Sequence, residues 1–327
     1  MEKNSKIIAL AFSDLHLNDW NKFESRKNTA LDILKNILAK SALIGVPALF
    51  CGDFFHNPDK ISQELFHDLI SFKSVVEKEI KNTSKLPKLF AIKGNHDMYH
   101  TNSLNSGVAG WHDSFDKIFD WYYPIDLKTV SLYKGVYVTG IPYIDHNKGL
   151  NEYLKDIKLP KGKNILLLHT DYPGAKDNDG REIGSVENLN TNLLSKFDLV
   201  LCGHIHKPQR LSKKVYMIGA PYQQRRTDRD SSLGYWEIRE DLSMTFIPLK
   251  DYPKYIDVET PDEVKEDGNY YTVIPKDTRV PISNNHKITR VLSKKSLARK
   301  YMREKGIKDK DKKTLLIDIL KKSEDLC

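Results

Sequence analysis

Five short segments of the sequence carry side chains of the types that can bind metal ions. They are Asp14-Leu-His16, Gly52-Asp53-Phe-Phe-His56, Gly94-Asn95-His96-Asp97, Leu168-His169-Thr170 and Gly203-His204-Ile-His206. Each segment follows a short apolar run of the kind that forms a buried strand. Because the carboxyl ends of such strands meet at one edge of an α/β sheet, we expect these Asp, Asn and His side chains to converge on one site.

The residue types at this site indicate a particular metal chemistry. Asp and Asn supply hard oxygen ligands, His supplies a borderline nitrogen, and no thiolate is required. That mixture suits Mn²⁺, Fe²⁺ or Zn²⁺ better than Ca²⁺ or a structural zinc ion. A central carboxylate can bridge two ions about 3.5–4 Å apart, which activate water and stabilise phosphoryl oxygens. The pattern therefore predicts phosphoester hydrolysis without a covalent enzyme intermediate.

Each segment taken alone also has an ordinary structural explanation. Asp14 could cap a helix, and His169 could be a core histidine with satisfied hydrogen bonds. Gly-Asp and Gly-Asn pairs are common in turns. All five segments nevertheless follow apolar runs and offer metal ligands, and this joint pattern favours a metal site.

The remaining sequence indicates the elements that position these segments. Buried strands are predicted at Ile7–Phe12, Ala48–Cys51, Leu89–Ile92, Val136–Thr139, Ile165–Leu168, Leu199–Cys202 and Val215–Ile218. Amphipathic helices are predicted over residues 26–40 and 61–80. Strands and helices alternate early in the chain and strands dominate later, which favours a layered α/β domain with its sheets at the centre. Residues 98–134 are predicted to be a turn-rich insertion. Its aromatic side chains are expected to pack together, and stacking on nucleic-acid bases is the less favoured alternative.

The last third of the chain is expected to add smaller units. Residues 235–250 indicate a closing hairpin, and two strand-like pieces, Tyr255–Val258 and Tyr270–Ile274, follow among several prolines. We therefore divide the chain into a catalytic domain over residues 1–254, a small cap or linker over 255–285 and a basic helical tail over 286–327. Within that tail an apolar face is formed by Leu315, Leu316, Ile319 and Leu320.

Composition restricts the class of protein. The net charge is +8, and the last 42 residues hold 14 Lys and Arg against 6 Asp and Glu, which accounts for the whole excess. Such a tail is either a solvated helix or a patch for a polyanion or acidic partner. No apolar run approaches the ~20 residues that cross a bilayer, and no signal peptide precedes the first strand, so a cytoplasmic protein is expected. Cys51, Cys202 and Cys327 form no paired motif, which argues against a zinc knuckle or a disulfide framework.

The motif order DxH, GD, GNHD, H and GHxH resembles the signature of the calcineurin-like metallophosphoesterases, here over residues 14–206. Within that superfamily the sequence looks most like the SbcD nuclease subunit, the bacterial and phage relative of the meiotic-recombination-eleven nuclease. That resemblance depends on residues 52–56, on Gly-His-Ile-His-Lys-Pro-Gln at 203–209 and on Gly-Ala-Pro-Tyr-Gln at 219–223. It implies a four-layer αββα sandwich with a small C-terminal cap region and a helical tail. The short chain is closer to the phage branch than to the long cellular members.

The resemblance also implies a role for each side chain. One ion would be held by Asp14, His16, Asp53 and His206, and the second by Asp53, Asn95, His169 and His204. His96 would lie by the scissile phosphate and protonate the leaving 3′ oxygen, with Asp97 orienting it. His56 would position the DNA backbone. The family prefers Mn²⁺ and acts as a 3′-to-5′ exonuclease on duplex DNA and as an endonuclease on single strands.

Family members work as homodimers bound to an SMC-like ATPase of the SbcC type. By resemblance, the ATPase would contact the helical tail over residues 286–327. The predicted cap is shorter than in long relatives, which would limit its grip on a duplex.

Three other functions remain open from the sequence. A metallophosphatase of the same superfamily is less favoured, because Gly-Asp-Phe-Phe-His replaces the Arg-containing motif of phosphoprotein phosphatases. A cyclic-nucleotide phosphodiesterase is harder to exclude by motif, although such enzymes usually lack a cap and basic tail. A non-catalytic DNA-tethering scaffold would fit the basic tail, but it would have no need for a clustered set of costly polar residues.

Overall fold

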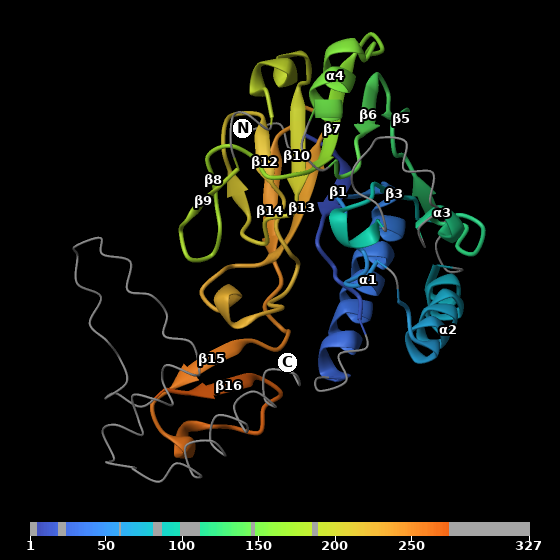
Figure 1. The fold of residues 1–327 in the computed structure, drawn as a ribbon. Helices are drawn as coiled ribbons and strands as arrows, with labels where there is room; N and C mark the ends of the chain where they lie inside the picture. The colour runs from blue at the N-terminus through green and yellow to red at the C-terminus, as the bar shows by residue number, and fades with distance from the viewer. Residues whose placement is uncertain are drawn as a thin grey trace, which may run out of the picture. The chain divides into compact units, whose positions relative to one another are not determined.

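The computed structural model describes residues 5–18, 24–58, 60–80, 87–98, 112–144, 148–184 and 189–274, and Figure 1 shows its fold. The chain divides into two units, residues 1–275 and 276–327, and the described residues all belong to the first. The predicted basic tail, with Leu315, Leu316, Ile319 and Leu320, lies outside the described residues. The division at residues 254 and 285 therefore stays a prediction.

The first of two six-stranded sheets carries three of the five predicted segments. Its order is β14-β13-β1-β2-β3-β4. The bounds are β1 Ile7–Phe12, β2 Ala48–Phe50, β3 Leu89–Ala91, β4 Tyr122–Pro124, β13 Gly234–Arg239 and β14 Met244–Pro248. β1 to β4 are parallel, and Phe12 is in register with Phe50, as Phe50 is with Ala91. Because three neighbouring strands end at the same level, the loops that follow them begin side by side.

The second sheet carries the other two segments. Its order is β11-β12-β10-β7-β6-β5. The bounds are β5 Lys128–Tyr133, β6 Val136–Gly140, β7 Lys163–His169, β10 Leu199–Gly203, β11 Gln209–Arg210 and β12 Val215–Met217. β7 and β10 are parallel, and His169 is in register with Gly203. His169 therefore ends its strand directly beside the turn that carries His204.

Three hydrophobic cores define four layers. Helices α1 (Glu24–Ile44) and α2 (Gln63–Ile80) pack on one face of the first sheet. A second core fills the space between the sheets, and a third lies under α4 (Lys148–Asp156) and the short helix η2 (Thr191–Lys196). In β1 the side chains alternate: Leu10 and Phe12 belong to the helix-side core, whereas Ala9 and Ala11 belong to the inter-sheet core. A strand buried on both faces has no polar face, which explains its continuous apolar run.

The predicted layered α/β fold is confirmed. All seven predicted strands, both helices and the closing hairpin are present. The prediction of a turn-rich insertion over residues 98–134 is partly wrong, because β4 and β5 add an edge strand to each sheet. Strand β5 is half exposed, so it lacks the apolar run that marks a buried strand. The expected aromatic packing is present: Trp121 and Tyr122 are buried with Phe115 and Phe119 around them.

The two predicted cap strands form a parallel pair, β15 (Tyr255–Val258) and β16 (Tyr270–Val273). They are tied to the segment that follows β12. Arg226 donates to both carboxylate oxygens of Asp257 at 2.8 and 2.9 Å, and the Tyr255 amide donates to Gln223 Oε1 at 2.7 Å. Residues 275–285 of the predicted cap are outside the described residues.

Candidate metal centre

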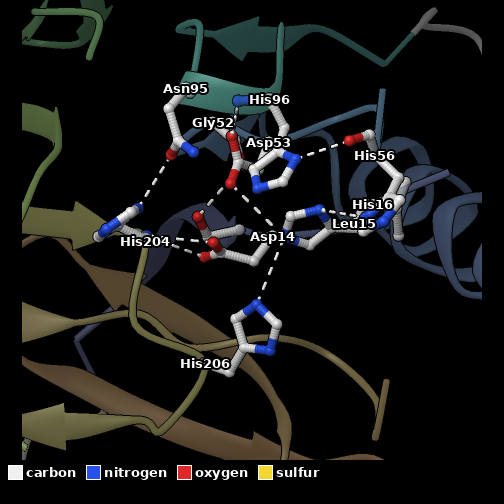
Figure 2. A network of polar contacts seen from close by, with 12 residues as sticks. Asp14, Leu15, His16, Gly52, Asp53, His56, Asn95, His96, His204 and His206 are labelled. Carbon is white, nitrogen blue, oxygen red and sulfur yellow. Dashed lines mark hydrogen bonds and ion pairs between the residues drawn. The ribbon is translucent and has the colours of Figure 1, made fainter. Parts of the chain in front are cut away.

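The side chains of the five segments meet at the carboxyl ends of the strands. Figure 2 shows residues from four of the segments, and His169 of the fifth lies 3.3 Å from Asp53. Loops after β1, β2 and β3 bring Asp14, His16, Asp53 and Asn95 from the first sheet, and β7 and β10 bring the histidines of the second. The loops are bonded to one another: the His204 amide donates to both Asp14 carboxylate oxygens at 3.1 and 3.2 Å. Tyr222 of the Gly-Ala-Pro-Tyr segment donates to the Leu15 carbonyl at 3.1 Å. That segment thus supports the loop after β1.

The backbone at this place is strained. Six non-glycine residues in the described part of the chain have positive φ, and four of them are Asp14 (54°), His16 (47°), Asp53 (60°) and His204 (90°). The left-handed conformation costs an L-residue roughly 1–2 kcal/mol. Concentration of that cost on four candidate ligands indicates that the fold is arranged to direct these side chains.

The donor atoms form two groups. In the first, Asp14, His16 and His206 place ligand atoms within 4.8 Å of one another. Asp53, His169 and His204 do the same in the second group. Oδ2 of Asp53 lies 3.5 Å from His16 Nε2 and 3.3 Å from His169 Nε2. One carboxylate oxygen of Asp53 therefore faces both groups.

In the second group, acceptor atoms face one another. His169 donates its Nδ1 hydrogen to the Cys51 carbonyl at 2.6 Å, so its Nε2 presents a lone pair in the neutral ring. That Nε2 lies 3.1 Å from Asn95 Oδ1, which in turn lies 2.9 Å from His204 Nδ1. Such a convergence of lone pairs is unfavourable unless a proton or a cation lies between them. A divalent ion fits this donor set of carboxylate, amide oxygen and imidazole.

The pKa values of the metal-free site follow from the same geometry. Burial lowers the pKa of His169, but the adjacent Asp53 carboxylate outweighs it and raises the pKa to about 9. Burial opposes ionisation of Asp53, yet His169 and His16 hold its pKa below the usual range. For His16, burial dominates and lowers the pKa well below its ordinary value. In the metal-free protein His169 thus carries the proton that pairs with Asp53.

His96 lies beside the shared carboxylate. Its amide donates to Asp53 Oδ1 at 2.9 Å, and its Nδ1 donates to the His56 carbonyl at 2.6 Å. The second ring nitrogen, Nε2, is therefore the one that can meet a substrate. The His56 ring stacks on the His96 ring with centroids 5.3 Å apart. His16, His56 and His96 also place donor nitrogens within 4.8 Å of one another.

Asp97 has a different set of contacts from those expected. Its carboxylate accepts hydrogen bonds from the amides of Phe54, Phe55 and Gly94 at 2.9–3.1 Å. These bonds fix the loop that carries Asp53, while the His96 ring is held by the His56 carbonyl. Burial, and then the Asp53 charge, raise the pKa of Asp97 to about 7. We therefore place Asp97 as a support for the Asp53 loop.

The centre opens into a pocket of about 680 Å³. The pocket is lined by residues of the predicted segments and by basic and aromatic side chains: His16, Asp53, His56, His96, His204 and His206, with Arg26, Arg225, Arg226 and Tyr255. Sequence reasoning missed the residues that complete this site: Asp171, Gln224, Arg225 and Asp228. The Gln224 side chain donates to the Asp14 carbonyl at 2.5 Å. Asp171 stands only two positions after His169, so extending that segment would have found it; Asp228 has no such signal.

Comparison with known proteins shows the family to which the chain belongs. The chain matches the calcineurin-like phosphoesterase family over residues 9–208, and because that is more than half of its length, it belongs to the family. It is 27% identical over 229 residues to the SbcD component of nuclease SbcCD from Staphylococcus epidermidis, covering 62% of this chain and 58% of the relative. The same component from Staphylococcus saprophyticus is 26% identical over 231 residues, with 64% and 59% covered. The chain thus spans less than two thirds of the length of these relatives.

Among solved structures, TT1561 of Thermus thermophilus is 13% identical with a TM-score of 0.43, covering 75% of this chain and 99% of that one. Over the described residues, none of the helices combines the length and apolar character needed to cross a membrane. By family the protein is a phosphoester hydrolase, with candidate metal-binding Asp and His groups gathered at the carboxyl ends of its strands.

Proposed function

We propose that the chain is the nuclease subunit of an SbcCD-like recombination and repair complex and hydrolyses DNA phosphodiesters with two Mn²⁺ ions. The observation that carries the proposal is the convergence of two donor groups on Oδ2 of Asp53. The first ion would be held by Asp14, His16, Asp53 and His206. The second would be held by Asp53, Asn95, His169 and His204. When bound, such ions supply Lewis acidity and activate water for attack on phosphorus.

His96 is the candidate for proton transfer to the leaving oxygen. Its Nδ1 donates to the His56 carbonyl, so the ring is oriented before substrate binds. Nε2 carries a hydrogen only in the imidazolium form, and it is that form that would give its Nε2 proton to the 3′ oxygen and become neutral. General acid catalysis of this kind contributes about 10²–10⁴-fold to a rate. His56 stacks on the same ring and would position the DNA backbone for digestion from an end.

A DNA substrate is supported by the basic side chains at the pocket and by the SbcD relatives. Arg225 lines the pocket with a side chain that is 62% exposed, and its Nη2 lies 3.4 Å from each ring nitrogen of His206. A phosphate bound near the first ion would therefore also meet a guanidinium group. The acidic residues Asp171, Asp177 and Asp179 line the pocket too.

The proposal includes an SbcC-type ATPase partner, a homodimer and a cytoplasmic location. The two SbcD relatives support the partner, and residues 286–327 are the candidate contact. Deletion of that segment should abolish association with the ATPase and leave Mn²⁺-dependent cleavage of short substrates. Retained association in a pull-down would remove the tail from the proposal, and sedimentation of the purified chain tests the homodimer.

One assay separates the proposed nuclease from the other members of the family. Purified protein with Mn²⁺ is given end-labelled duplex DNA and single-stranded circles, beside p-nitrophenyl phosphate and a cyclic nucleotide. We expect nucleotide release from duplex ends and cutting of the circles, both lost in His96→Ala while Mn²⁺ stays bound. Rapid hydrolysis of the monoester or cyclic nucleotide without DNA degradation would contradict the nuclease function, and DNA binding without turnover would indicate a scaffold.

A further inference from the structure

The two histidines of the Gly203-His204-Ile-His206 turn each meet a carboxylate that no motif of the sequence pointed to. In both cases the carboxylate contacts the ring nitrogen on the far side from the other metal donors. Figure 2 shows the donor side of this arrangement, where His204 faces Asn95 and His206 faces His16.

His204 is held by Asp171. Its Nε2 donates to Asp171 Oδ1 at 3.1 Å, while its Nδ1 lies 2.9 Å from Asn95 Oδ1. A neutral imidazole carries one hydrogen, so donation from Nε2 leaves the lone pair on Nδ1, directed at the second donor group. Asp171 comes from the loop directly after β7, the strand that ends with His169. Its position is therefore fixed by the same strand that supplies another donor of that group.

His206 is paired with Asp228. Its Nε2 lies 3.3 Å from His16 Nε2, and its Nδ1 lies 3.6 Å from Asp228 Oδ2. The Asp228 side chain is fully buried and accepts from the amides of Gln224 and Arg225 at 2.9 and 3.1 Å and from Asn178 Nδ2 at 2.5 Å. Because these bonds come from fixed groups, the carboxylate is held in place independently of His206.

We propose that Asp171 and Asp228 are positioning residues that set the ring orientation and tautomer of His204 and His206, each serving one of the two ions. Metal-bound histidines characteristically donate their other N–H to such a group, which orients the ring and raises its basicity. The inference rests on the metal centre of the proposed function and is independent of whether the substrate is DNA.

The roles proposed for Asp171 and Asp228 are tested by measuring Mn²⁺ binding directly, by calorimetry and by the electron paramagnetic resonance signal of free Mn²⁺. Asp171→Ala should weaken one of two bound ions about 10–100-fold. Asp171→Asn should lose less of the Mn²⁺ affinity, because the amide oxygen of Asn can still accept a hydrogen bond from His204 Nε2. The matched control is Asp179→Ala, which removes a carboxylate from the same pocket and should bind Mn²⁺ like the unaltered protein.

Histidine variants assign each carboxylate to its ion. In the His206→Ala background, we expect the added substitution Asp171→Ala to lower the affinity for the remaining ion by the same factor, about 10–100-fold. In the His204→Ala background, adding Asp171→Ala should leave the affinity for the remaining ion unchanged. Adding Asp228→Asn should weaken the remaining ion in the His204→Ala background and leave it unchanged in the His206→Ala background. Since Asp228 is buried, Asn178→Ala serves as a milder second variant, which should weaken the same ion as Asp228→Asn.

The proposal would be overturned if either carboxylate variant lowered Mn²⁺ affinity equally in both histidine backgrounds. It would also be overturned if Asp179→Ala lowered Mn²⁺ affinity as much as Asp171→Ala, because either result would show a general charge effect. Failure of the unaltered protein to bind two ions would instead refute the proposed metal centre itself. The two failures are thus distinguishable in one set of titrations.

Discussion

Binding of Mn²⁺ at the site should release protons, and the number released follows from the pKa of His169. In the metal-free protein the pKa of His169 is about 9, because Asp53 outweighs the effect of burial. A ligand histidine must be deprotonated, so an ion that binds Nε2 displaces that proton. At pH 8 a group with this pKa is about nine-tenths protonated, and at pH 9 about half protonated. We therefore expect His169 to contribute about one proton per chain at pH 8 and about half at pH 9.

Calorimetry in two buffers of different ionisation enthalpy measures this count directly. Asp97 has a raised pKa of about 7, so at pH 8 it is largely ionised before metal binds. Asp97 is therefore not expected to change the count at pH 8. The matched control is Asp179→Ala, which removes a carboxylate from the same pocket and should release the same number of protons. Release of no protons at pH 8, or a count that does not fall between pH 8 and pH 9, would refute the assignment of His169 as a protonated partner of Asp53 that becomes a metal ligand.

Three further results are expected. His56→Ala should impair digestion of duplex ends more than cutting of single strands, because the carbonyl that holds His96 belongs to the backbone and remains; equal loss of both activities would contradict this role. Gly94→Ala should abolish Mn²⁺ binding and lower the free energy of unfolding by about 1–3 kcal/mol, because the added Cβ would fall on the Asp53 carboxylate. Unchanged Mn²⁺ binding in calorimetry would contradict this prediction. Arg225→Ala should weaken DNA binding and reduce the slope of log affinity against log salt concentration by about 1. An unchanged slope would exclude a contact between Arg225 and a DNA phosphate.

The metal-free fold has its own pH dependence. A raised histidine pKa means that the His169–Asp53 pair stabilises the protein fully below pH ~6.5 and loses that contribution as pH rises through about 9. Thermal unfolding in a chelator should therefore show a falling midpoint between pH 7 and pH 9.5. A midpoint that rises over this range would contradict the assigned protonation of the pair.

The strands that position the site could be predicted because burial on both faces leaves a continuous apolar run. The half-exposed edge strand β5 has no such run and could not be found in this way. The five polar segments were found for the same reason as the strands: each directly follows an apolar run. Parallel pairing in register, such as Phe12 with Phe50, then explains why side chains so far apart in sequence meet.

Contacts made only in three dimensions had no signal in the sequence. Asp97 lies next to His96 in the chain, but its oxygens turn toward the amides of Phe54 and Phe55. Asp228 reaches His206 from a short helix, η3 (Arg226–Asp228), that no apolar pattern marks. Adjacency in sequence therefore predicted some of the residues that lie at the site but not what each one contacts.

The most direct measurement is the anomalous scattering of a crystal soaked in Mn²⁺. The account predicts two peaks about 3.5–4 Å apart on either side of the Asp53 carboxylate, one beside His16 and His206 and the other beside His169 and His204. A single peak, or two peaks that do not share Asp53, would contradict it.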